Sequence, residues 1–130
     1  MYDIITKVKK APKDLVDKFA TVEESASIYE VMKKNALPGN IKPIWPGTRM
    51  CGTALTVYSR PGDNLMVYKA LDMLQPGDVL VVSYDGYIGC GGLWGGMMST
   101  SAKAKGAAGF VTDGAVRDSM LIKELDFPVF

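Results

Sequence analysis

Arg117 and Asp118 are the side chains of this sequence best placed to do chemistry, because they follow directly on a short apolar run that ends in a glycine turn, Gly109–Gly114. In an α/β protein such a run forms a buried strand, and ligands bind at the carboxyl ends of these strands. The guanidinium of Arg117 can hold a carboxylate through two parallel hydrogen bonds. The carboxylate of Asp118 offers the hard oxygens that divalent cations prefer. The pair therefore suggests metal-assisted chemistry on a small carboxylic acid, against the alternative of an exposed ion pair without a function.

A glycine-rich loop over residues 84–92 leads into a second suggestive stretch, a helix that we expect over 94–105. The first amides of a helix are free and lie at the positive end of its dipole, so they bind anions. Gly95 and Gly96 would let a ligand approach this backbone closely, although glycines in such a loop also serve simply to form a tight turn. Met97 and Met98 would contribute through their backbone, because their side chains are better suited to a core or a pocket wall.

These two stretches would form one site if the strands that precede them are neighbours. A carboxylate would then lie between the helix amides and Arg117, and a cation would bridge Asp118 to the adjacent keto oxygen. This arrangement suits the enolate of a 2-oxo acid, because a Lewis acid stabilises the charge that develops there. Nucleotide binding is disfavoured, since the P-loop pattern is absent and the dinucleotide fingerprint is incomplete.

Composition narrows the chemistry further. The 130 residues, with 48% hydrophobic and 22% charged side chains, suit a single globular domain over 1–130. The formal net charge of +1 and the lack of a basic stripe give no sign of a nucleic-acid partner. Histidine is absent, which excludes a Ser-His-Asp triad, histidine metal ligands and a histidine base. Acid–base work must therefore fall to carboxylates, Tyr, Lys, Cys or water.

The cysteines, the N-terminal residues and the length of the apolar runs predict where in the cell the protein is found. Cys51 and Cys90 fit neither zinc nor redox spacing, and a buried or loop thiol is the simpler interpretation of each. The N-terminal residues lack a signal-peptide layout, and no apolar run approaches the length of a membrane span. We therefore expect a cytoplasmic protein without a membrane partner.

Helices and strands are expected to alternate from Met50 onward, which predicts βαβ units and a parallel or mixed sheet with helices packed on it. Thr21 and Glu24 form a capping-box pattern, which predicts a helix from there to about Asn35. Phe130 lies inside an apolar strand, so either another subunit pairs with this strand or the chain is a fragment; we favour the fragment. The other expected helices cover 13–20, 64–74 and 119–125, and the expected strands cover 50–58, 79–82, 108–112 and 128–130.

Several stretches together resemble the RraA-like family, and the resemblance covers most of the chain. The family contains the metal-dependent 4-hydroxy-4-methyl-2-oxoglutarate and 4-carboxy-4-hydroxy-2-oxoadipate aldolases and the regulator of ribonuclease activity A. Each stretch is weak alone, and the combination is specific. The stretches are 41–43, 46–54, 61–64, 76–82, 94–106, 113–118 and 127–130.

The resemblance implies an α/β fold of the swivelling β/β/α type, with a mixed, largely parallel central sheet flanked by helices. It also implies homotrimers or hexamers with sites at subunit boundaries. In such a site Arg117 would hold the pyruvyl carboxylate, and Asp118 would bind Mg²⁺ or Mn²⁺ largely through waters. The backbone of Gly95, Gly96, Met97 and Met98 would contact the pyruvyl group.

The sequence departs from the aldolases of this family at Gly96, where they carry an Asp or Glu that orders a water for proton transfer. Asp85 would either substitute for that carboxylate or serve the turn in which it lies. The family also continues past the equivalent of Phe130 and draws further metal-site carboxylates from there. Asp118 argues against a regulator, because the regulators typically lack it.

The resulting expectation is a divalent-metal-dependent lyase acting on a small 2-oxo acid. Retro-aldol cleavage would release pyruvate, or oxaloacetate would be decarboxylated. The alternative is a non-catalytic regulator or binding protein on the same scaffold.

Overall fold

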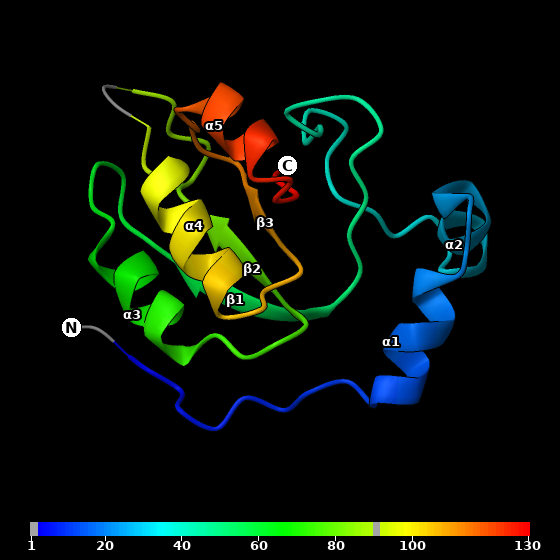
Figure 1. Ribbon diagram of the computed structural model, residues 1–130. Helices are drawn as coiled ribbons and strands as arrows, with labels where there is room; N and C mark the ends of the chain where they lie inside the picture. The colour runs from blue at the N-terminus through cyan, green and yellow to red at the C-terminus, as the bar shows by residue number, and fades with distance from the viewer. Residues whose placement is uncertain (1–2, 90–91) are drawn as a thin grey trace.

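The computed structural model describes residues 3–89 and 92–130, and its elements alternate as the sequence predicts (Figure 1). Cys90 and Gly91, which belong to the expected glycine-rich loop, lie outside the described residues. The elements in chain order are α1 (Lys13–Ala20), α2 (Ser25–Val31), β1 (Thr53–Tyr58), α3 (Leu65–Met73), β2 (Asp78–Ser83), α4 (Gly96–Ala104), β3 (Gly109–Thr112) and α5 (Ser119–Glu124).

The three strands form one sheet in the order β1-β2-β3, and both pairings are parallel. Leu80 at the centre of β2 is in register with Leu55 on one side and Phe110 on the other. A parallel order requires a crossover between consecutive strands, which α3 and α4 supply. The carboxyl ends of all three strands therefore meet at one edge of the sheet, as the sequence implied for β2 and β3.

The expected strand at 128–130 lies beside β3. Val129 forms a parallel bridge with Phe110, whose amide donates to the carbonyl of Pro128 at 2.9 Å. The amide of Phe130 in turn donates to the carbonyl of Phe110 at 2.9 Å. This segment thus extends the hydrogen-bonded backbone of the sheet past β3.

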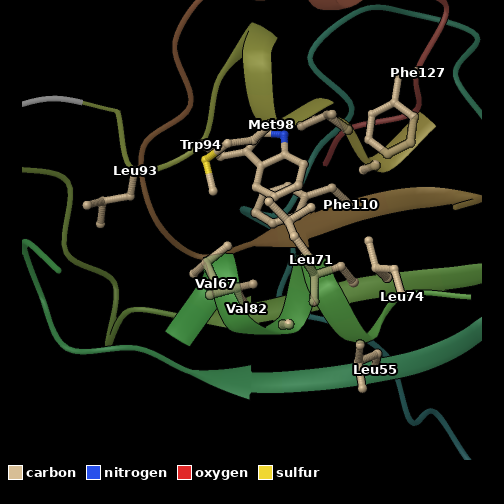
Figure 2. Close-up of a cluster of buried hydrophobic side chains, with 14 of the residues drawn as sticks. Leu55, Val67, Leu71, Leu74, Val82, Leu93, Trp94, Met98, Phe110 and Phe127 are labelled. Carbon is tan, nitrogen blue, oxygen red and sulfur yellow. The ribbon is translucent and has the colours of Figure 1, made fainter. Parts of the chain in front are cut away.

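The hydrophobic core lies between the sheet and the three helices α3, α4 and α5 (Figures 1 and 2). Trp94 is fully buried at its centre and stacks on Phe110, with ring centroids 3.7 Å apart and the planes 9° from parallel. The indole N–H of Trp94 donates to the hydroxyl of Ser99 at 2.8 Å, so its polar atom is satisfied inside the core. Burial of such side chains is what fixes the helices on this face.

Of the two N-terminal helices, α1 has the predicted bounds, 13–20, whereas α2 departs from the prediction. The hydroxyl of Thr21 donates back to the carbonyl of Lys18 at 2.8 Å, and the residue that caps α2 is Glu24. The predicted capping box is therefore wrong, because the end of α1 uses the hydroxyl that it needed. The helix also ends at Val31, well before Asn35; α2 buries no residue, so only local propensity supports its length.

Candidate functional site

The segments that follow β2 and β3 lie side by side and bring the two predicted stretches together. The amide of Leu93 donates to the carbonyl of Ala115 at 3.1 Å, and the amide of Arg117 donates to the carbonyl of Trp94 at 3.0 Å. Trp94 and Val116 form a parallel bridge between these bonds. Trp94 is therefore extended, and the helix predicted from residue 94 begins at Gly96. The start of α4 faces the Arg117–Asp118 pair as a result.

Asp118 is the residue through which α4 and the Arg117 segment are joined. Its Oδ2 accepts a hydrogen bond from the amide of Gly96 at 3.1 Å, and the Nε of Arg117 lies 3.8 Å from the same oxygen. Its backbone is left-handed, with φ 60° and ψ 36°, which is uncommon outside glycine. Such strain persists only where the surroundings enforce it, and it is frequent at binding sites.

Gly92 and Gly95 are glycines because Arg117 and Asp118 occupy the space of their missing side chains. A Cβ on Gly92 would lie 2.7 Å from the backbone nitrogen of Arg117. A Cβ on Gly95 would lie 2.8 Å from Oδ2 of Asp118 and 3.0 Å from Cγ of Arg117. The separations of 2.7 Å and 2.8 Å are shorter than a real Cβ atom allows, so the two glycines make room for the charged pair. The sequence shows these glycines but not this reason for them.

Leu121 fills the space that a side chain at position 96 would need. A Cβ on Gly96 would lie 2.3 Å from Cδ2 of Leu121 and 3.1 Å from its Cγ. Position 96, where the resemblance to the aldolases leads us to expect a carboxylate, therefore lies against an apolar side chain of α5. Leu121 was not singled out from the sequence, because only the packing of the two helices reveals its role.

The charged pair is open to solvent, and free amides lie beside it. The side chain of Arg117 is 68% exposed and that of Asp118 is 47% exposed. Within the described chain the amides of Met97 and Met98, in the first turn of α4, make no backbone hydrogen bond. Their side chains diverge, since Met98 is buried in the core and Met97 is 87% exposed. Met98 therefore lies in the core, one of the two places expected for these side chains, whereas for Met97 only the role of a pocket wall remains a prediction.

The donor set suits a cation that keeps most of its own waters. Among the described residues no group of three or more His, Cys, Asp or Glu side chains could hold a metal ion. Asp118 can supply one carboxylate while its Oδ2 also accepts the amide of Gly96. Mg²⁺ is commonly held by one or two carboxylates together with waters and substrate oxygens. The residues therefore fit a water-rich magnesium site and not a closed protein cage.

Asp113 ties the end of β3 to the loop after β2. Its carboxylate accepts hydrogen bonds from the amide of Tyr84 at 2.6 Å, the hydroxyl of Ser83 at 2.9 Å and the amide of Gly86 at 3.1 Å. Burial opposes ionisation of Asp113, but these bonds outweigh it and hold the pKa of its carboxyl below the ordinary value. Its role at local amides follows the expectation for an acid before a glycine turn.

Asp85 lies toward β1 and contacts a side chain of that strand. Its Oδ2 accepts a hydrogen bond from the hydroxyl of Tyr58 at 2.8 Å, and its backbone is left-handed with φ 54°. The hydrogen bond and the charge of Asp85 raise the pKa of Tyr58. These contacts support the turn interpretation of Asp85 over a role beside Arg117.

Tyr84 is a buried polar side chain that the sequence did not single out. Its hydroxyl is the buried side-chain atom without a hydrogen-bond partner in the described part of the chain. Burial, with the nearby charges of Asp63 and Asp113, raises the pKa of this hydroxyl. Tyr84 therefore stays neutral and acts as a packing group against Gly114.

Comparison with known proteins supplies named relatives. A protein of Halalkalibacterium halodurans named "Putative 4-hydroxy-4-methyl-2-oxoglutarate aldolase" is 36% identical over 123 residues, which are 95% of this chain and 58% of the relative. The chain thus spans somewhat more than half the length of this relative.

Solved structures give the same fold. The RNA-processing inhibitor RraA from Thermus thermophilis has a TM-score of 0.73 at 29% identity, covering 84% of this chain and 66% of its own. An unusual member of the RNase ES inhibitor RraA family from Streptomyces coelicolor has a TM-score of 0.77 at 29% identity, covering 95% and 64%. The model of the RraA-like family, described as Aldolase/RraA, matches residues 14–130. The chain therefore belongs to the RraA-like family.

Proposed function

We propose that this chain carries the substrate site of a divalent-metal-dependent lyase for small 2-oxo acids. The reaction is retro-aldol cleavage that releases pyruvate, or decarboxylation of oxaloacetate. The observation that carries the proposal is the position of Arg117 and Asp118 beside the free amides at the start of α4. The relative named for an aldolase supports a lyase, and its name indicates a substrate of this class.

The proposed roles follow from the chemistry of each group. Arg117 binds the substrate carboxylate through its guanidinium fork, and the backbone amides of Met97 and Met98 donate to the same anion. Asp118 holds Mg²⁺ or Mn²⁺ through one carboxylate oxygen and waters. When bound, the cation supplies Lewis-acid polarisation of the 2-oxo oxygen. Gly95 and Gly96 leave the room beside the start of α4 that the side chains of Asp118 and Leu121 occupy.

Proton transfer is assigned to solvent water in this proposal. Position 96 has no side chain, and Leu121 occupies the neighbouring space. A guanidinium group has donors and no acceptor, so Arg117 orients the substrate and does not act as a base. The exposure of the charged pair gives water direct access to the reacting carbon.

The setting of the site is likewise proposed from the family. We place the protein in the cytoplasm as a single-domain homotrimer or hexamer, acting on a small molecule and not on nucleic acid. Within the described residues, no helix has both the length and the apolar character of a membrane span.

A pyruvate-release assay tests this proposal directly. The unaltered chain should release pyruvate from 4-hydroxy-4-methyl-2-oxoglutarate or from oxaloacetate only with Mg²⁺ or Mn²⁺ present. The Arg117→Ala variant should lose about 100-fold or more of the rate, as expected when a charged group that holds the reacting anion is removed. Lys123→Ala removes another exposed cation, on α5, and should leave the rate unchanged. Release that survives both chelation and Arg117→Ala would rule the proposal out.

A regulator on the same scaffold is the second candidate. Gly96 favours it, because no carboxylate is available at that position, and two similar structures are those of an RNA-processing inhibitor and of a member of an RNase ES inhibitor family. Calorimetric titration with Mg²⁺ separates the candidates. Binding that disappears in Asp118→Asn supports the lyase, whereas no binding together with no turnover supports the regulator.

A further inference from the structure

A groove of about 580 Å³ lies along β1, apart from the Arg117–Asp118 pair. Its walls are the N-terminal segment, β1 and α3, and Figure 1 shows that segment running past α3 and β1. The floor contains the buried side chains of Leu55 and Ala70 and the half-buried side chains of Met66 and Met73. A space of this size with a mostly apolar lining is typical of small-molecule sites.

The N-terminal wall is anchored at its far end without closing the groove. The Nζ of Lys10 lies 2.6 Å from Oδ1 of the buried Asp78, and the amide of Ala11 donates to the hydroxyl of Thr53 at 3.3 Å. Val8 packs against the hydrophobic core. In the described chain, no backbone hydrogen bond joins residues 3–11 to β1. The wall therefore lines the edge of β1 and leaves an open groove between them.

The rim of the groove is strongly cationic. Four of its lining residues are basic and one, Asp3, is acidic; the basic residues are Lys7, Lys9, Arg60 and Lys69. In the described part of the chain, the three lysines form no ion pair. This local excess stands out in a chain whose formal net charge is only +1. Unpaired cations above an apolar floor attract an anion that also carries an apolar body.

We propose that this groove binds an amphipathic carboxylate, an acyl or aryl acid with its apolar chain on the floor and its head group at the cationic rim. The groove favours a small molecule over an extended peptide, because the N-terminal segment already runs along the edge that a peptide would need. The site is separate from the proposed lyase site and does not depend on it.

Calorimetric titration with decanoate tests the proposal, with decanol and acetate as probes that lack the charge and the chain respectively. Decanoate should bind and the other two should bind far more weakly. The double variant Arg60→Glu/Lys69→Glu should weaken decanoate binding about tenfold or more, since exposed charges act modestly but both are reversed. The matched double variant Lys18→Glu/Lys123→Glu reverses two exposed cations outside the groove and should bind as before.

A second variant separates site filling from loss of charge. Thr56 is exposed on β1 and lines the groove, so Thr56→Trp should fill it, abolish decanoate binding and leave the thermal unfolding transition in place. Decanol binding as tightly as decanoate, or undiminished decanoate binding in the charge-reversed variant, would overturn the proposal. So would sedimentation showing a dimer that the same charge reversals dissociate, because a second copy would then occupy the groove.

Discussion

At the scale of single residues, the position of Arg117 and Asp118 depends on two neighbouring glycines, Gly92 and Gly95. Arg117 and Asp118 could be selected from their types and their place after an apolar run. The need for Gly92 and Gly95 could not, because it arises from the bridge between Trp94 and Val116, which sequence spacing does not reveal. Glycines that follow a strand usually indicate a turn, and here two of them make room for a charged pair.

The Gly95→Ala variant tests whether this glycine positions Arg117 and Asp118. The added methyl group would lie 2.8 Å from Oδ2 of Asp118, so the carboxylate or the Arg117 stem must move away. A displaced Arg117 would lose one charge-assisted hydrogen bond to the carboxylate of pyruvate. This loss should weaken pyruvate binding in the presence of Mg²⁺ about tenfold. Calorimetry measures the affinity, and the thermal transition checks the fold.

Gly39→Ala provides the matched control for that substitution. No atom lies within 4 Å of the position that a Cβ on Gly39 would take, so an added methyl group meets open space. This variant should bind pyruvate as the unaltered chain does. Equal losses of pyruvate affinity in Gly95→Ala and Gly39→Ala would show that Gly95 does not position the charged pair.

At the scale of elements, the sequence predicts best where burial decides. The continuous apolar run 79–82 indicated a strand buried on both sides, and β2 is the central strand of the sheet. The helices before β1 bury no residue, so burial does not determine their ends. There the predicted cap at Thr21 and the predicted length of α2 were both wrong. The start of α4 was misplaced by two residues because pairing with Val116 overrides helix propensity at Trp94.

Asp113 joins the ends of β2 and β3, so its ionisation should appear in the pH dependence of stability. Its folded-state pKa lies below the ordinary value, so its contribution is present above the unfolded pKa of about 3.9 and is lost as pH falls through the folded pKa. Asp113→Asn should lower the free energy of unfolding at neutral pH by about 1–2 kcal/mol, because the Asn side chain has only one acceptor oxygen and leaves at least one backbone amide without its acceptor.

Urea unfolding at a series of pH values measures this effect. The unaltered chain should lose stability in the acid range more steeply than Asp113→Asn, so the two curves should converge as pH falls. Curves that stay parallel down to the acid limit would show that the carboxylate contributes no pH-dependent stability.

At the scale of the whole molecule, few contacts connect the N-terminal part to the sheet. Helices α1 and α2 bury no residue, whereas the core lies almost entirely between the sheet and α3, α4 and α5. The ion pair between Lys10 and Asp78 is therefore a principal link between the two parts. The sequence does not reveal this link, because the partners are 68 positions apart and no pattern connects them.

Lys10→Met should destabilise the fold more than the loss of an ordinary surface pair. Asp78 is only 3% exposed, and without Lys10 its charge keeps one described hydrogen bond, from the amide of Gln75. An uncompensated buried charge costs about 3–5 kcal/mol, and because Lys10 is itself 32% exposed we expect a loss of about 2 kcal/mol. Lys13→Met breaks the exposed pair with Asp17 and should cost about 0.5 kcal/mol or less. Chemical denaturation compares the two variants, and equal losses would mean that the Lys10 link does not hold the N-terminal segment to the sheet.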